Sequence, residues 1–128
     1  MNDKIADTIN RLYTAGLSKK ESVSMYGSKM VFSILELLKR EGYVTDVSKK
    51  GKGVESISVT LKYSGDTPAI NGVKRISKSS KRMYLNVSGI HPVKSGKGVL
   101  VISTPKGILT DKEARKAHVG GEPLFTIW

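Results

Sequence analysis

The residues best suited to chemistry in this chain are small hydroxyls, glycines and one acid near its carboxyl end. They form two motifs, Ser103-Thr104-Pro105-Lys106-Gly107 and Gly120-Gly121-Glu122. Hydroxyls both donate and accept hydrogen bonds, and glycines let a backbone approach a polar polymer closely. Neither motif holds a nucleophile with a recognisable base and orienting partner. The motifs favour a binding surface over a catalytic centre, although a plain strand, a turn and a helix end would have the same composition.

A basic cluster lies upstream of these motifs. From Thr67 to Thr110 the chain has no carboxylate but eight Lys and Arg. A solvated face normally mixes both signs of charge, so this stretch favours a polyanionic partner. Cations beside hydroxyls can hold phosphates without reading bases. The candidate contacts are Lys74, Arg75, Lys78, Lys81 and Arg82. Tyr84 follows them and could stack on a base or simply pack in a hairpin.

The composition of the whole chain supports this view and narrows the function. The 22 Lys and Arg against 11 Asp and Glu give a formal charge of +11, which favours nucleic acid as the partner. There is no cysteine, so disulfides and thiolate metal sites are impossible. Ser95-Gly96-Lys97-Gly98 lacks the remaining residues of a P-loop, and the two histidines lack metalloprotease spacing. We therefore expect no enzyme activity, no cofactor, no metal and no small-molecule substrate.

The amino-terminal half predicts two helices followed by a hairpin. Apolar residues at helical spacing and suitable caps predict one helix from Asp3 to Gly16 and a second from Ser28 to Gly42, with a polar loop between them. Alternation then predicts strands at Tyr43–Val47 and Val54–Tyr63, joined by a hairpin turn at 49–53. No run of about 18 apolar residues predicts a membrane span, and no secretory signal is expected.

The carboxyl-terminal half predicts mostly strands, and the turn cluster Ser64–Pro68 predicts a domain boundary before it. The expected strands are Val73–Ser77, Met83–Val87, Val99–Ser103 and Leu124–Trp128. One short helix should begin at the capping box formed by Thr110 and Glu113. The predicted fold class is α+β with two small domains: residues 1–64, helix-containing with a short sheet, and residues 69–128, strand-rich with one short helix.

The order of these motifs resembles the S-eight family of small ribosomal subunit proteins, of bacterial type. That family carries Ser-Thr-Ser-Lys-Gly, a Thr-Asp-x-x-Ala-Arg helix, Gly-Gly-Glu and a terminal apolar strand, which match the segment from Ser103 to Trp128. Asn71–Lys78 and the Ser28-Lys29 pair also follow the family. The chain departs from the family pattern at Lys4, Tyr13 and Pro105.

The resemblance implies a structural protein that binds the central domain of small-subunit ribosomal RNA, aids its assembly and touches neighbouring small-subunit proteins. It implies RNA contact at Tyr84, Ser103, Thr104, Lys106 and Gly107. It implies the same for Gly120, Gly121 and Glu122, and it makes Lys29 a phosphate contact, with a plain cap and surface lysine as the alternative. A bacterial or organellar ribosome is the expected location. A general basic DNA-binding protein and a nucleic-acid-processing factor remain the competing classes.

Overall fold

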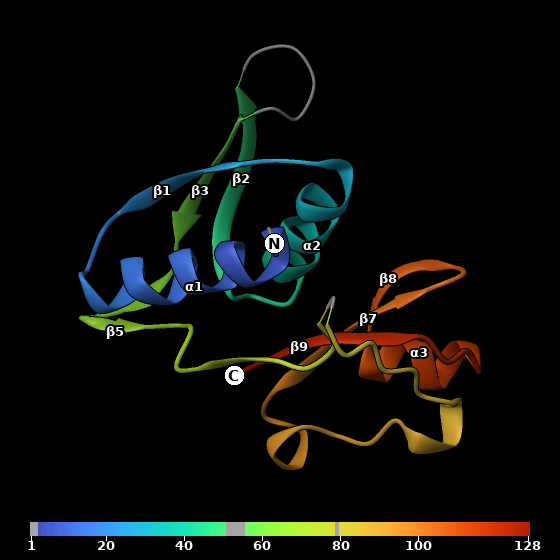
Figure 1. Cartoon of the computed structure of the whole chain (residues 1–128). Helices are drawn as coiled ribbons and strands as arrows, with labels where there is room; N and C mark the ends of the chain where they lie inside the picture. The colour runs from blue at the N-terminus through green and yellow to red at the C-terminus, as the bar shows by residue number, and fades with distance from the viewer. Residues whose placement is uncertain (1–2, 51–55, 79) are drawn as a thin grey trace. The chain divides into compact units, whose positions relative to one another are not determined.

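The structure is a computed structural model and describes residues 3–50, 56–78 and 80–128. It divides into two compact units, one ending at Asn71 and the other running from Gly72 to Trp128 (Figure 1). Each unit combines helices with antiparallel strands, which confirms the α+β class.

Two helices begin the first unit, and both were predicted. α1 (Lys4–Leu17) starts where the Asp3 carboxylate accepts a hydrogen bond from the Ala6 N–H at 3.0 Å. α2 (Lys29–Arg40) starts where the Ser28 hydroxyl accepts from the Val31 N–H at 3.2 Å. These caps satisfy amides that have no partner inside the helix. The apolar stripes of both helices are buried, as their 3.6-residue spacing requires.

The three-stranded sheet of this unit has the order β1-β3-β2 and is antiparallel throughout. It contains β1 (Ser22–Tyr26), β2 (Val44–Lys50) and β3 (Ser56–Leu61). The polar loop predicted between the helices was wrong in part, because β1 lies there. In β1, Val23 and the buried Met25 alternate with exposed residues, the pattern of a half-buried strand. Part of the predicted turn at 49–53 lies outside the described residues.

The turn cluster after this sheet forms a small hairpin of β4 (Tyr63–Ser64) and β5 (Thr67–Pro68). Gly65, at the turn between these strands, has φ +62°, a conformation that favours glycine. The hairpin belongs to the first unit.

The second unit is built on a four-stranded antiparallel sheet of order β6-β9-β7-β8. Its elements, in chain order, are β6 (Val73–Arg75), the 3-10 turns η1 (Val87–Gly89) and η2 (Lys94–Gly96), β7 (Val99–Thr104), β8 (Gly107–Thr110), α3 (Asp111–Ala117) and β9 (Glu122–Ile127). β9 pairs with β6 on one side and β7 on the other. β9 is therefore an inner strand, with β6 beside its last part, residues 125–127, and β7 beside its whole length.

α3 is fixed to the sheet at its first turn. The predicted capping box is confirmed, because the Thr110 hydroxyl accepts from the Glu113 N–H and the Glu113 carboxylate accepts from the Thr110 N–H. The buried Asp111 accepts from the Leu100 N–H at 3.1 Å and pairs with Arg115 at 3.0 Å. The helix thereby presents Ala114 to the core beside Ile102.

The predicted strand Met83–Val87 was wrong. Only Leu85 forms a bridge, to Gly121, and η1 follows it. Met83 and Tyr84 are 40% and 66% exposed, so this segment buries no continuous face against the sheet. A strand forms where neighbouring segments pair with its backbone and pack against its side chains. This segment has such a neighbour only at Leu85, so it is not a strand.

Candidate nucleic-acid interface

Three segments that are distant in the sequence meet at the start of β9. Ser103 of β7 pairs with Glu122, and Leu85 exchanges two backbone hydrogen bonds with Gly121 at 2.9 and 3.0 Å. The Ser77 N–H donates to the Pro123 carbonyl at 3.0 Å. Three features are therefore neighbours in space: the basic cluster, the motif Ser103–Gly107 and the motif Gly120–Glu122. The sequence alone did not reveal this proximity.

The double glycine is required by the chain's own backbone. A Cβ at Gly120 would lie 2.2 Å from the Leu85 carbonyl oxygen, and a Cβ at Gly121 would lie 2.2 Å from the Ser103 carbonyl oxygen. Real side chains never come so close to a backbone oxygen, so any larger residue forces the segments apart. The glycines thus hold Leu85 and Ser103 against β9, an internal reason for their presence besides any contact with a ligand.

Glu122 is bound inside the unit. Its Oε2 accepts a hydrogen bond from the Ser77 hydroxyl at 2.6 Å, and its Oε1 lies 3.8 Å from Nη1 of Arg82. Ser77 is fully buried and also accepts from the Met83 N–H at 3.1 Å. Ser77 and Glu122 therefore fix both ends of the chain between residues 77 and 83. Sequence reasoning missed Ser77, whose only signal was a hydroxyl among the basic residues.

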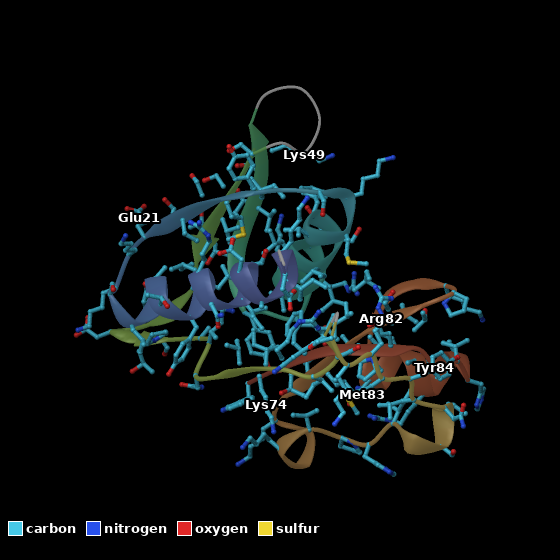
Figure 2. All side chains as sticks on the ribbon, viewed as in Figure 1. Glu21, Lys49, Lys74, Arg82, Met83 and Tyr84 are labelled. Carbon is cyan, nitrogen blue, oxygen red and sulfur yellow. The ribbon has the colours of Figure 1, made fainter. Side chains whose placement is uncertain are left out.

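The segment held in this way is the basic turn, defined here as residues 78–82 without Ser79, which lies outside the described residues. Lys78 and Lys81 exchange backbone hydrogen bonds at 3.1 and 3.0 Å and are exposed. The Arg82 side chain is 76% exposed. Figure 2 labels Arg82 at the end of this turn and Met83 and Tyr84 just after it. Three cations on one turn create a positive potential suited to phosphate groups.

Lys74 and Arg75 lie elsewhere on the sheet. Lys74 is exposed opposite Thr126. Thr126 is four residues along β9 from Glu122, or about 13 Å at the usual rise of a strand. Nη1 of Arg75 donates to the Leu124 carbonyl, and the residue is half-buried. Lys74 is thus placed as an outlying cation, while Arg75 has a structural partner in its own sheet.

The hydroxyl turn, defined here as Thr104 to Gly107, joins β7 to β8. The Thr104 hydroxyl donates to the Gly107 carbonyl at 2.8 Å and accepts from the Lys106 N–H at 3.1 Å. Its one proton is therefore used inside the turn, and only a lone pair remains for a ligand. Pro105 occupies the exposed first corner, where its fixed φ suits the turn, and Gly107 has φ +110°. Lys106 is exposed at the tip, and Ser103 is half-buried.

Lys29 belongs to the other unit. It is the exposed first residue of α2, next to the Ser28 cap. A helix amino terminus favours anions, so the position suits a phosphate contact on that unit.

Other kinds of site find no support in the described part of the chain. No group of three or more His, Asp or Glu in residues 3–50, 56–78 and 80–128 is arranged to hold a metal ion. No helix in the same ranges has the length and apolar character needed to cross a membrane.

Comparison with known proteins gives the family. The small ribosomal subunit protein uS8 of Spiroplasma kunkelii is 45% identical over 128 residues, which is 100% of this chain and 99% of that protein. The uS8 proteins of Mycoplasmopsis pulmonis and Kosmotoga olearia are 47% and 46% identical, and the matches cover 98% of each. They cover 100% and 99% of this chain, respectively. The model of the family described as ribosomal protein S8 matches residues 3–128. This chain therefore belongs to the ribosomal protein S8 family.

Proposed function

We propose that this chain is a structural protein of the small ribosomal subunit and that its carboxyl-terminal unit binds the central domain of small-subunit ribosomal RNA. The observation that carries the proposal is the convergence of the basic turn, the hydroxyl turn and Tyr84 at the start of β9. Relatives named as small-subunit proteins match the full length of the chain, which supports the same role. Since they are bacterial proteins, we place the chain on a bacterial ribosome.

The proposed interface has an electrostatic component. The exposed cations Lys78, Lys81, Arg82 and Lys106 lie near phosphates and release counterions when RNA binds. Lys74 adds an outlying cation on this unit, and Lys29 supplies a separate phosphate contact on the other unit. Arg75 supports the sheet through its bond to the Leu124 carbonyl, so we assign it a smaller share of the RNA affinity.

The second component recognises the shape of one RNA. Tyr84 is 66% exposed and offers a face on which an unpaired base can stack. Beside it, the Ser103 hydroxyl and the remaining lone pair of Thr104 can meet 2′-hydroxyls or base edges in a distorted minor groove. Three glycines carry no side chain that would keep RNA away from the backbone: Gly107, Gly120 and Gly121. Glu122 contributes mainly by holding the basic turn through Ser77.

The remaining parts of the proposal concern partners and chemistry. A structural role in the ribosome needs no bond-breaking step, and we propose none, together with no cofactor and no small-molecule substrate. Neighbouring small-subunit proteins are the further partners. We propose that they contact surfaces outside the basic and hydroxyl turns.

The test compares RNA with DNA of equal length. Filter binding of the full chain to central-domain fragments of small-subunit ribosomal RNA should give a much higher affinity than binding to duplex DNA across a salt series. The affinities for both should fall as salt rises, because counterion release contributes to each. Equal affinity for the two nucleic acids at every salt concentration would refute the proposal.

A further inference from the structure

The outer edge of β1, on the amino-terminal unit, is an open strand edge. Within the part of the chain that the structure describes, β1 pairs only with β3, in a continuous register from Ser22↔Thr60 to Tyr26↔Ser56. The Leu61 N–H donates to the Glu21 carbonyl at 2.9 Å. Because bonded and non-bonded pairs alternate in an antiparallel ladder, Val23 and Met25 bond to β3. Ser22, Ser24 and Tyr26 therefore direct their N–H and C=O groups away from the sheet.

These outward groups have no partner in the described part of the chain. No backbone hydrogen bond to the outward groups of Ser22, Ser24 or Tyr26 occurs among residues 3–50, 56–78 and 80–128. Ser22 and Ser24 are exposed, and Tyr26 is 85% exposed. An extended chain laid along this edge would find alternating donors and acceptors ready to bond.

The other edge of the same sheet is protected in the way that strand edges usually are. β2 has a register shift between Val44 and Asp46 and carries the charged residues Asp46 and Lys49. Asp46 pairs with Lys39 of α2 at 3.3 Å, and the Lys49 ammonium lies 4.4 Å from the centre of the Phe32 ring. Figure 2 shows Glu21 just before β1 and Lys49 near the far end of β2. Bulges and charges prevent edge-to-edge pairing, and β1 has no bulge, no charge and no proline.

Hollows lie beside β1 where an added strand would run. One, of about 320 Å³, is lined by Ala15, Val23 and six polar or charged residues: Asp7, Asn10, Arg11, Thr14, Ser18 and Lys20. The next, of about 480 Å³, is lined by Arg11, Ser24, Met25, Tyr26 and Ser56. The shared Arg11 side chain links the two. Alternate side chains of an added strand can therefore enter space between the edge and α1.

We propose that β1 accepts an extended segment of a neighbouring small-subunit protein as a fourth strand of this sheet, an inference that rests on the proposed ribosomal role. Main-chain hydrogen bonds to Ser22, Ser24 and Tyr26 supply the affinity, and alternate small or apolar side chains beside Val23 and Met25 supply the fit. A third hollow, of about 430 Å³, is lined by Asp3, Lys4, Asp7, Tyr26 and Gly27. The exposed Tyr26 ring there offers a face for a Lys or Arg of the partner next to its strand.

The chemistry of the edge selects a polypeptide over the other occupants. An RNA backbone offers mainly hydrogen-bond acceptors and would leave the outward carbonyls of Ser22, Ser24 and Tyr26 without donors. A second copy of this chain would bring together two proteins of formal charge +11. An extended peptide matches both the donors and the acceptors.

Amide hydrogen exchange of the full chain tests the proposal in three states: alone, with deproteinised small-subunit ribosomal RNA, and in subunits rebuilt from that RNA and total small-subunit proteins. We expect exchange at Ser22, Ser24 and Tyr26 to slow by about 100-fold or more only in the rebuilt subunits. Equal slowing with RNA alone would identify an RNA contact, and slowing in the concentrated free chain would identify a second copy. Either result, or no slowing in any state, would overturn the proposal.

The variant Ser24→Pro separates strand addition from simple burial. It removes the outward N–H of Ser24 but none of the bonds to β3, and edge strands tolerate proline at such a position. We expect protection at Ser22 and Tyr26 in rebuilt subunits to be lost, while protection at Val23 and Met25 remains. Ser24→Thr keeps the amide and should behave as the unaltered chain. Protection of Ser22 and Tyr26 that survives in Ser24→Pro would refute strand addition.

The same variants distinguish this proposal from the RNA-binding proposal. Filter binding of Ser24→Pro to ribosomal RNA should match that of the unaltered chain, because the edge lies outside the RNA-contacting residues assigned above. A chain that prefers ribosomal RNA yet keeps fast exchange at β1 refutes only the strand addition. A chain with no preference for ribosomal RNA refutes the proposed function.

Discussion

The basic turn and the hydroxyl turn meet at the start of β9, yet they are held in shape by different kinds of group. In the basic turn, buried Ser77 and half-buried Glu122 set the conformation, while Lys78 and Lys81 are exposed. In the hydroxyl turn, the Thr104 side chain sets the conformation and is also the expected RNA contact. Binding and folding should therefore be separable by mutation in the first turn but coupled in the second.

The largest expected effect on stability and on RNA preference comes from a substitution that pushes Ser103 away from Gly121. Gly121→Ala places a Cβ about where the Ser103 carbonyl oxygen needs room, 2.2 Å away, and also within 2.9 Å of the Ile102 side chain. Overpacking of this kind costs about 1–3 kcal/mol or more of the free energy of unfolding. We expect urea unfolding to show that loss and filter binding to show loss of the preference for ribosomal RNA.

Gly89→Ala is the matched control for this change. A Cβ there would make an ordinary contact of 3.7 Å with the Leu85 side chain. Its stability and its RNA preference should remain near those of the unaltered chain. A Gly121→Ala protein as stable as Gly89→Ala would show that β9 does not hold the turns together by close approach.

The next effect tests what shapes the basic turn. Ser77→Ala removes the hydroxyl that donates to Glu122 and accepts from the Met83 N–H. The Met83 N–H loses this acceptor, and half-buried Glu122 keeps only the Arg82 contact at 3.8 Å. The expected loss is about 1–3 kcal/mol in the free energy of unfolding. Amide exchange at Met83 should accelerate, and affinity for all RNAs should fall as the cations lose their fixed arrangement. Unchanged exchange at Met83 would contradict the role assigned to Ser77.

Changing a cation of the basic turn should affect binding without affecting folding. Lys78→Gln is expected to weaken binding to all RNAs alike and to reduce the slope of log affinity against log salt by about 1. The midpoint of urea unfolding should not move, because the Lys78 bonds that shape the turn are made by its backbone. Lys112→Gln removes an equal charge from an exposed position on α3 and serves as the control. An equal change of slope in both variants would show that net charge alone matters.

The sequence predicted the elements with strong local signals. α1, α2 and the Thr110 capping box were visible because their caps and apolar spacing lie within a few residues. The strand at Met83–Val87 was predicted wrongly, and β1 was missed, because a strand is decided by neighbours that are distant in the sequence. Local patterns are sufficient to predict these helices but insufficient to predict strands at the edges of sheets.

The candidate site shows the same limit. The residue types of the basic and hydroxyl turns were recognisable in the sequence, and so was the absence of carboxylates around them. The convergence of these turns on β9 depends on pairing between distant segments, and the bond from Ser77 to Glu122 spans 45 residues. The Thr104 bonds are local to its turn, but the sequence does not show whether that hydroxyl is used there. Sequence reasoning names groups able to bind, but only the fold shows which of them the protein already uses.

Thr104→Ala tests the coupling of binding and folding in the hydroxyl turn. It removes one donated and one accepted hydrogen bond at a half-buried site, for an expected cost of about 1 kcal/mol. The preference for ribosomal RNA over other nucleic acids should fall at the same time, and Thr104→Ser should restore both properties. A variant with unaltered stability but lower preference would show that the hydroxyl serves the ligand alone. An unchanged ratio of specific to nonspecific affinity would contradict the RNA contact at this residue.

The smallest effect is expected at Pro105, where the Ser-Thr-Ser-Lys-Gly motif that the sequence resembles has a serine. Pro105→Ser should lower the free energy of unfolding by about 0.4–1 kcal/mol, because a proline that fits its turn restricts the unfolded chain. Pro105→Ala separates that loss from the gain of a hydroxyl, and both variants should be equally destabilised. Since Thr104 already closes the turn, we expect both to keep the preference for ribosomal RNA. A higher preference in Pro105→Ser alone would show that the tip of this turn reads RNA through a hydroxyl that the present chain lacks.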